Sequence, residues 1–276
     1  FLMTTHCGRA AVLIATVTIF SLSVTQSLTA VFDMGPSDPG LFDVVTNVPT
    51  DPDIPDDADF GGGSQFVQLN VADGGTVGND VEALANAEIN ISGGSVGSSV
   101  GANGGEINIS DGVVGGGLTA INGGMISITG GTVGSAATVF GGSQFNHSGG
   151  ILGAPGGVFN LFGGVLNLSG GTLNDAISAT NGSELNIFGT AFILDGVPLN
   201  SLVFNQATAI NTRDVTLNGT LADGSPFSFD LNTSAPFGED FIPSTVNLTV
   251  TLVPEPGSLA FVVIGTALFF RRRRVS

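Results

Sequence analysis

The sequence predicts an all-β fold, a parallel β-helix or solenoid of about seven coils of 18–21 residues. Three observations predict it. A short unit returns seven times across residues 64–190, apolar residues alternate with polar ones inside each unit, and glycines recur where the chain would turn. A single coil of this size cannot bury its apolar residues, whereas a stack of coils can.

The repeated unit is clearest in four copies, which read EINISGGSVG, EINISDGVVG, MISITGGTVG and QFNHSGGILG. The first apolar position of the unit is taken in turn by Leu69, Ile89, Ile107, Ile126, Phe145, Leu166 and Leu185. Alternation within the unit is the period-two pattern of a strand with one buried face. Gly-Gly and Asn-Gly pairs supply the corners, because glycine tolerates positive φ. A disordered glycine-rich tract and a β-sandwich are the alternative interpretations.

The segments on either side of the repeats have other compositions. Residues 1–30 are expected to be a signal peptide with a helical apolar core: Arg9 precedes an apolar stretch, and small residues lead to cleavage after Ala30. An uncleaved membrane anchor is the alternative. Residues 31–63 are expected to be an acidic, Pro-rich and mostly irregular lead-in. Residues 191–253 lose the glycine pattern and predict a β-rich cap with Asn-Gly and Asp-Gly turns, because an open solenoid end invites strand addition.

The C-terminal segment, residues 254–276, has three parts. Pro254, Glu255 and Pro256 come first, an apolar stretch over 259–270 follows, and Arg271, Arg272, Arg273 and Arg274 come last. As a helix, the apolar part would reach only about 18 Å, less than the ~30 Å core of a bilayer. We therefore expect a short membrane helix that serves as a transient stop, with the arginines on the cytoplasmic side.

This three-part end resembles the PEP-CTERM sorting signal of Gram-negative bacteria that make exopolysaccharide, a signature also known as the ice-binding-protein C-terminal domain. The resemblance implies a transient inner-membrane intermediate and cleavage near Pro254-Glu255-Pro256 by an exosortase-type membrane protease. Release to, or attachment at, the cell surface would follow. The glycine-rich repeats are also similar to those of uncharacterised PEP-CTERM proteins, a likeness that carries no known activity. An ordinary single-pass tail anchor is the alternative.

Charge and cysteine content exclude several classes of function. The net charge is −17, lysine is absent, and removal of both ends would leave Arg213 as the only cation. Such a body should repel nucleic acid, whose phosphates require neutralising cations. The only cysteine is Cys7, near the N-terminus, so the body can form neither a disulfide nor a cysteine metal site.

Two groups of polar residues are candidate binding sites. The first is a set of carboxylates that could bind Ca²⁺ weakly or form a solvated linker: Asp51, Asp53, Asp56, Asp57 and Asp59. The second is a stacked row of outward polar residues: Asn90, Ser92, Asn108, Ser110, Ser127, Thr129, Asn146, Ser148, Asn167 and Ser169. This surface ladder could meet polysaccharide or ordered water, or it could simply be solvated. Several of its Asn-x-Ser triplets are also glycosylation acceptors.

No catalytic residues, metal or cofactor are predicted. His147 is the only histidine of the body, and no Ser-His-Asp set or phosphate-binding loop occurs. We expect a non-enzymatic structural or adhesive protein of the cell surface or extracellular matrix. The alternatives are a glycan-binding module and a polysaccharide-active β-helix enzyme. The enzyme would use Glu88 and Glu106, which one coil separates.

Overall fold

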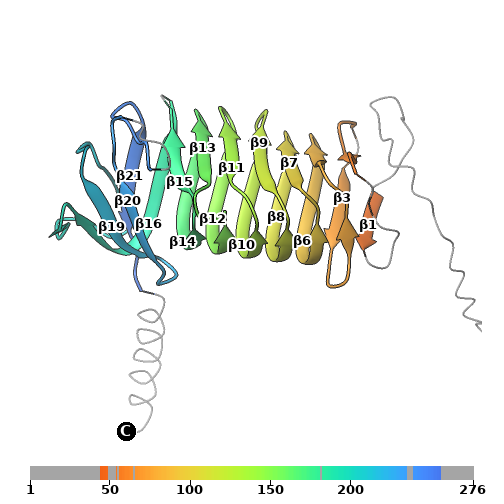
Figure 1. The fold of residues 1–276 in the computed structure, drawn as a ribbon, viewed down its shortest axis with the longest axis horizontal. Coiled ribbons are helices and arrows are strands. Elements are labelled where there is room, and N and C mark those ends of the chain that lie inside the picture. Colours follow the sequence, from red (N-terminus) through yellow and green to blue (C-terminus); the bar gives the residue numbers. More distant parts are fainter. Residues whose placement is uncertain are drawn as a thin grey trace, which may run out of the picture.

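The computed structural model describes residues 44–48, 54, 56–64, 66–180, 182–234 and 239–255. These residues form a rod of stacked coils, followed by further strands at its C-terminal end (Figure 1). The rod has two sheets of parallel strands. Sheet A contains β1 (Val44–Val48), β3 (Val67–Val71), β6 (Ala87–Val96), β8 (Glu106–Val114), β10 (Met125–Val133), β12 (Gln144–Leu152), β14 (Val165–Leu173) and β16 (Glu184–Leu194), with the short β4 (Thr76–Val77) paired to β6. Sheet B contains β2 (Asp59–Phe60), β5 (Val81–Leu84), β7 (Ser99–Asn103), β9 (Gly117–Ile121), β11 (Ala137–Phe140), β13 (Val158–Phe162) and β15 (Ala176–Ala179).

The register between coils follows the sequence repeat. Ile107 pairs with Ile89 below it and with Ile126 above it, and Ile126 pairs with Phe145. The residues aligned in the sequence therefore lie on top of one another. An all-β solenoid of about seven turns is confirmed, and no helix occurs among the described residues.

Each coil of sheet A bends within one long strand. In β6 the pairing with β8 shifts between Ile91 and Ser92, at the Gly93-Gly94 corner, and resumes at Ser95. Gly94 has a φ of 67°, which glycine adopts without strain. The chain on both sides of this corner thus belongs to one continuous strand, and a separate strand of each coil lies in sheet B.

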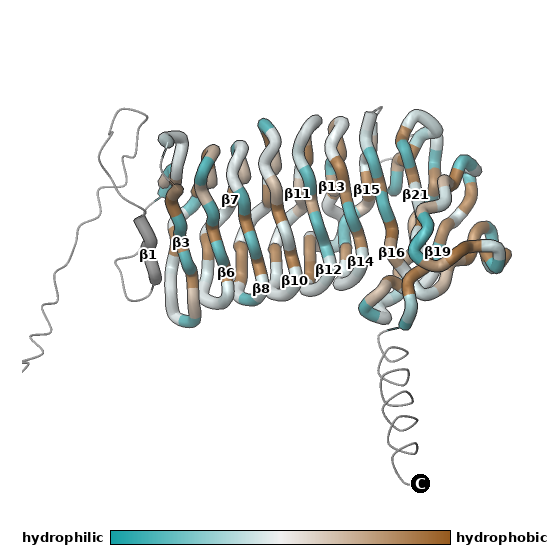
Figure 2. Tube along the Cα trace, turned by 180° about the vertical axis from the view of Figure 1, so that it is seen from behind, coloured by the Kyte–Doolittle hydropathy of each residue, from teal (hydrophilic) through white to brown (hydrophobic). Residues whose placement is uncertain are grey.

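The core lies between the two sheets. Along β6, Ile89 and Ile91 are buried, whereas Glu88 and Asn90, which alternate with them, face outward and are half-buried. Hydrophilic and hydrophobic residues alternate in the same way along the neighbouring strands (Figure 2). One contiguous apolar core runs the length of the stack, because each coil covers the apolar edge of the next.

The solenoid begins earlier than the boundary at residue 64 that the sequence predicts. β1 pairs in parallel with β3, and β2 pairs with β5. Ile54 and Phe60 are buried in the core of this first coil. The expectation of an irregular lead-in is therefore wrong for these residues. Prolines and aspartates dilute the apolar pattern here, although Ile54, Ala58 and Phe60 are buried.

Residues 191–255 add strands to the last coil. They contain β17 (Val197–Pro198), β18 (Ala207–Ala209), β19 (Thr216–Leu221), β20 (Pro226–Asp230) and β21 (Asn247–Leu252). β21 pairs in parallel with the first half of β16, and β19 pairs antiparallel with its second half. β18 pairs with β21, and β20 pairs with β19.

Two of the three predicted turns in this region are turns. Asp195-Gly196 and Asp223-Gly224 connect strands, and both glycines have positive φ. Asn218-Gly219 instead lies inside β19, where a side chain on Gly219 would collide with the main-chain oxygen of Ala191. Gly219 thus allows β19 to lie close to β16, and the prediction of a turn at this position is wrong.

Candidate functional site

The predicted surface ladder forms on the outer face of sheet A. One half-buried row crosses the sheet, one member from each coil: Asn70, Asn90, Asn108, Ser127, Asn146, Asn167, Asn186 and Thr249. Six of the seven steps along this row carry a side-chain hydrogen bond of 2.7–3.2 Å, the Asn108–Ser127 step being the exception. The row is longer than the sequence predicts, because Asn70, Asn186 and Thr249 extend it at both ends. Each bonded side chain thus tethers one coil to its neighbour.

Four hydroxyl members of the predicted ladder bond to the main chain, whereas the Ser127 hydroxyl accepts a bond from Asn146. The Ser92 hydroxyl donates to the carbonyl of Val71 in the preceding coil at 3.2 Å. Ser110, Thr129 and Ser148 make the equivalent bond at 3.2–3.4 Å. These residues lie at the bend of the strand, where the ladder of main-chain hydrogen bonds shifts register. Their hydroxyls therefore link adjacent coils at the bend.

Glu88 and Glu106 stack in register, as the sequence predicts. One carboxylate oxygen of Glu88 accepts a hydrogen bond from the Gln68 amide at 3.0 Å, and the other accepts one from the Asn108 amide at 3.1 Å. Amides of the coils below and above therefore hold this carboxylate in place. Glu88 thus links its own coil to the coils on both sides of it.

The acidic lead-in is divided between described and undescribed residues. Asp51 and Asp53 lie outside the described residues, and Asp56, Asp57 and Asp59 lie within the first coil. Asp56 accepts hydrogen bonds from the main-chain and side-chain nitrogens of Asn79 at 2.7 and 2.9 Å, so it anchors this coil to the next. Desolvation raises the pKa of Asp59, with smaller contributions from Glu82 and Asp57. Within the described part of the chain, no three His, Cys, Asp or Glu residues are grouped closely enough to hold a metal ion.

His147 occupies an interior position of the solenoid. The same row holds Ile128 in the coil below and Leu168 in the coil above. The imidazole is only 1% exposed, and neither ring nitrogen makes a hydrogen bond. Desolvation lowers the pKa of His147, while the Thr172 main chain and the Asp223 carboxylate oppose that effect. The sequence marks this residue only as an outlier in the repeat.

Asp175 is a second buried side chain without a hydrogen bond, and no repeat pattern in the sequence predicted it. It lies at the corner between β14 and β15, is 5% exposed, and neither carboxylate oxygen has a hydrogen-bond partner. The carboxylate packs against Gly153 and Gly157 of the coil below, where any side chain would collide with it. Burial raises the pKa of Asp175 to about 6, opposed by the main chain of Ala154. The available signal was a carboxylate at a corner position that Gly157, Gly116 and Ser98 take in other coils.

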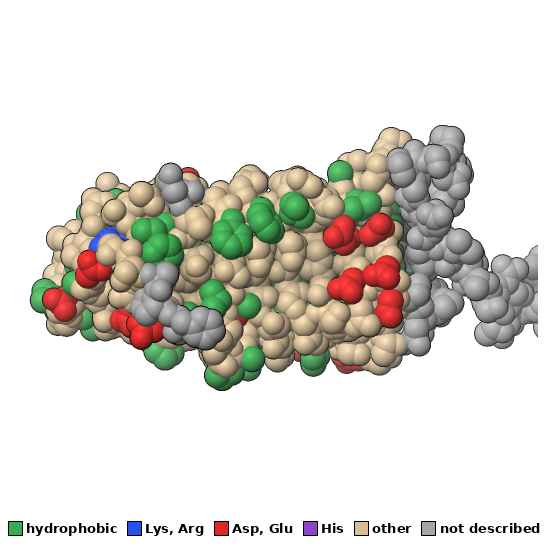
Figure 3. All heavy atoms as spheres, turned by 45° about the horizontal axis from the view of Figure 1, so that its top comes forward, with side chains coloured by type: hydrophobic (Ala, Val, Ile, Leu, Met, Phe, Trp, Pro, Cys, Tyr) green, Lys and Arg blue, Asp and Glu red, His purple; other side chains and the backbone are tan. Residues whose placement is uncertain are grey.

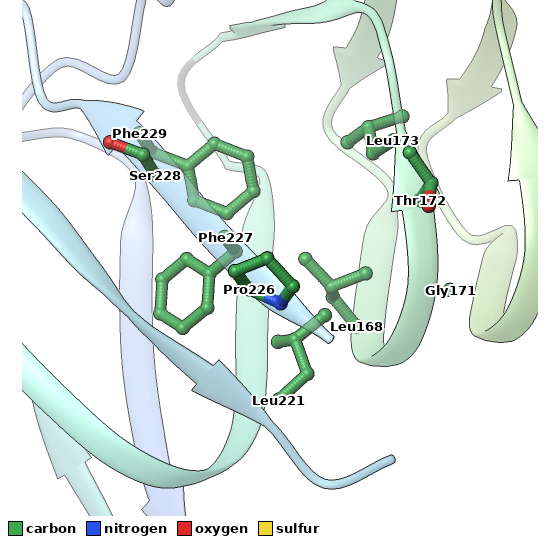
Figure 4. Close-up of a pocket in the computed structure, with 9 residues that line it drawn as sticks. All are labelled: Leu168, Gly171, Thr172, Leu173, Leu221, Pro226, Phe227, Ser228 and Phe229. Carbon is green, nitrogen blue, oxygen red and sulfur yellow. The ribbon is translucent and has the colours of Figure 1, made fainter. Parts of the chain in front are cut away.

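A cavity of about 120 Å³ separates the solenoid from the β19–β20 hairpin. Its walls come from Leu168 and residues 171–173 on one side, and from Leu221 and residues 226–229 on the other (Figure 4). The side chains that face the cavity are mainly aliphatic and aromatic, and no titratable side chain lines it. The cavity is a packing gap between hairpin and coil and holds none of the predicted site residues.

The sorting residues lie at the edge of the described chain. Val253 still donates a main-chain hydrogen bond to Gly189 at 2.8 Å, and Pro254 and Glu255 beyond it are exposed. Ala30, Pro256 and Arg271 to Arg274 lie outside the described residues, as do the expected signal helix and membrane helix. Among the residues that the structure describes, no helix has the length and apolar character needed to cross a membrane.

Comparison of the chain with protein-family models, curated proteins and solved structures finds no match.

Proposed function

We propose that this chain is an exported structural or adhesive protein of the cell surface or extracellular matrix, sorted through its C-terminal PEP-CTERM-like segment. The observation that best supports the role is the coil-to-coil bonding of the outward polar side chains. Six amide or hydroxyl bonds cross the outer face of sheet A, and hydroxyl-to-carbonyl bonds brace its bend. A one-dimensional stack tied in this way suits a stiff spacer or scaffold.

We further propose that residues 191–253 cap the solenoid. Asp240 supports this role because its two carboxylate oxygens accept main-chain hydrogen bonds from Ile177 and Asp230, at 2.7 and 2.8 Å. Phe241 forms a bridge with Ser178 on β15, the last strand of sheet B. Pro226 lies in β20, one of the two outer strands of sheet A at this end, and has no N–H to offer. These features block the addition of a further strand.

Sorting would proceed in three steps. A signal peptide cleaved after Ala30 would take the chain through the inner membrane, the apolar C-terminal segment would stop it there, and an exosortase-type protease would cut near Pro254-Glu255-Pro256. The exposure of Pro254 and Glu255 immediately after β21 supports this order. Proteases act on exposed backbone outside the folded core.

Mass spectrometry of the surface form tests the proposal. In a Gram-negative exopolysaccharide producer with an exosortase, the recovered protein should begin after Ala30 and end near Pro254-Glu255-Pro256. Glu255→Gln should accumulate uncleaved in the inner membrane. Glu239→Gln, another exposed glutamate 16 residues upstream, is the matched control and should be processed normally. An intact C-terminus at the surface would contradict the proposed sorting.

The enzymatic alternative makes a separate prediction. A two-carboxylate hydrolase would release reducing sugar from acidic exopolysaccharide, and Glu88→Gln would abolish that release. The hydrogen bonds from Gln68 and Asn108 to Glu88 favour the structural role instead. We expect no release by the unaltered chain.

A further inference from the structure

The middle of the solenoid has no charged side chain of its own, and the Asp223 carboxylate of the C-terminal strands reaches it at Gly171. Between Asp111 and Asp175 the sequence has no Asp, Glu, Lys or Arg, although the whole chain has a net charge of −17. The one titratable side chain there, His147, is buried. Acidic side chains gather toward both ends of the rod, away from its middle (Figure 3). We call residues 112–174 the uncharged belt.

Within the belt, the outer face of sheet B has two parallel rows. The first row is polar and consists of Thr119, Thr138 and Asn160, which lie in register. The second row lies two residues further along the same strands and consists of Ile121, Phe140 and Phe162. Residues two apart in a strand point to the same side, so both rows share one face. We call this face the belt stripe.

The aromatic pair of the belt stripe lies open to solvent. Phe140 is 37% exposed and Phe162 is 41% exposed, and their ring centroids are 5.6 Å apart at an interplanar angle of 43°. Hydrophobic side chains form a row along the middle of this surface (Figure 3). Adjacent exposed aromatic rings gain free energy when a ligand covers them. The half-buried hydroxyls and amide of the first row lie beside them.

We propose that the belt stripe binds an uncharged, linear polysaccharide that lies along the axis of the rod. The apolar C–H faces of the sugar rings would pack on Phe140 and Phe162. The sugar hydroxyls would exchange hydrogen bonds with Thr119, Thr138 and Asn160. This inference rests on the proposed surface role and names the ligand class of that role.

The charge distribution selects this ligand over others. An anionic polymer would be repelled by a chain of net charge −17. A cationic partner would be drawn to the acidic ends of the rod, away from the belt. A second copy would bring the same negative charge with it. An uncharged polymer with repeated apolar faces and hydroxyl groups avoids all three problems, and coils about 4.8 Å apart offer it a regular series of contacts.

Affinity electrophoresis of the full-length chain in mild detergent tests the proposal. Hydroxyethylcellulose is the neutral probe, galactomannan is a second neutral polymer, and carboxymethylcellulose is the anionic probe on the same glucan backbone as the first. At low salt we expect retardation by a neutral polymer and little by the anionic one. Added salt should raise retardation by carboxymethylcellulose, because it screens the repulsion.

Two double variants locate the binding face. Phe140→Ala/Phe162→Ala should weaken binding about tenfold or more, the scale of an interface hot spot. Val113→Ala/Ile151→Ala is the matched control, because these side chains are 49% and 43% exposed in the same belt but lie on sheet A. The control should bind normally. Circular dichroism of both variants should match that of the unaltered chain.

Three results of the binding experiments would overturn the proposal. They are no retardation by either neutral polymer, an equal loss of binding in the control variant, and equal retardation by the anionic polymer at low salt. A concentration-dependent dimer that Phe140→Ala/Phe162→Ala abolishes would also overturn it, in favour of self-association. If binding fails while mass spectrometry finds the processed chain at the surface, this inference fails and the proposed function stands.

Discussion

Replacement of His147 by leucine measures the cost of a polar side chain inside the solenoid. The imidazole lies in a row of aliphatic residues, between Ile128 and Leu168. A buried polar group without a hydrogen bond costs about 1–3 kcal/mol. Leucine has nearly the same volume and already occupies this row one coil above. We therefore expect His147→Leu to raise the free energy of unfolding by about 2 kcal/mol near pH 7.5.

The gain should grow as the pH falls. Burial lowers the pKa of His147 in the folded chain below its ordinary value of 6.5. Below pH 6.5, His147 binds a proton in the unfolded chain but stays neutral in the folded chain. The unaltered protein therefore loses up to about 1.4 kcal/mol of stability per pH unit, until the pH reaches the pKa of His147 in the folded chain. The leucine variant lacks this loss.

Urea denaturation followed by circular dichroism at pH 7.5, 6.5, 5.5 and 4.5 measures the effect. The informative quantity is the difference between variant and unaltered chain at each pH. His6, the other histidine, and all carboxylates are present in both proteins, so their contributions largely cancel. A variant that is less stable at pH 7.5, or a difference that does not change with pH, would refute the argument that the imidazole is buried, neutral and unpaired.

Three other substitutions test the corner, the ladder and the close contacts between coils. Asp175→Asn should stabilise the protein by up to about 3 kcal/mol above pH 6 and have little effect below pH 4. The pKa of Asp175 is about 6 in the folded chain against an ordinary 3.8, so ionisation of its carboxyl opposes folding as the pH rises. Melting temperatures between pH 4 and 8 check this, and a difference that does not change with pH would contradict it. Asn167→Ala removes two ladder bonds, of 2.9 and 3.0 Å, and should cost about 1–2 kcal/mol in urea denaturation, whereas the exposed Asn247→Ala should be nearly neutral. Gly116→Ala should lower the melting temperature far more than Gly141→Ala. A side chain at the first site would collide with a carbonyl of the coil below, whereas at the second it would make only ordinary contacts and φ is not positive. Equal effects would show that the coils part easily.

The repeat predicted the solenoid because one stacking rule acts on every coil. Ile89, Ile107 and Ile126 are aligned in the sequence by their spacing, and parallel pairing keeps equivalent residues in register. The outer asparagine ladder follows from the same rule, since Asn90 and Asn108 lie one residue further along each strand. Prediction failed where the pattern was diluted, as in the first coil. There Ile54 and Phe60 are separated by one proline, three aspartates and an alanine.

The sequence by itself determined the coil: its length, its inward residues, its corners and the acidic charge of the chain. The tertiary structure alone decided how individual polar and apolar groups are used. In the folded chain the ladder side chains bond to one another, and Asp175 is buried against Gly153 and Gly157. It also left Phe140 and Phe162 side by side on an uncharged surface. The reason is physical: spacing along the chain fixes which residues align, but only the packing of whole coils fixes which neighbour each side chain meets and how much water it keeps.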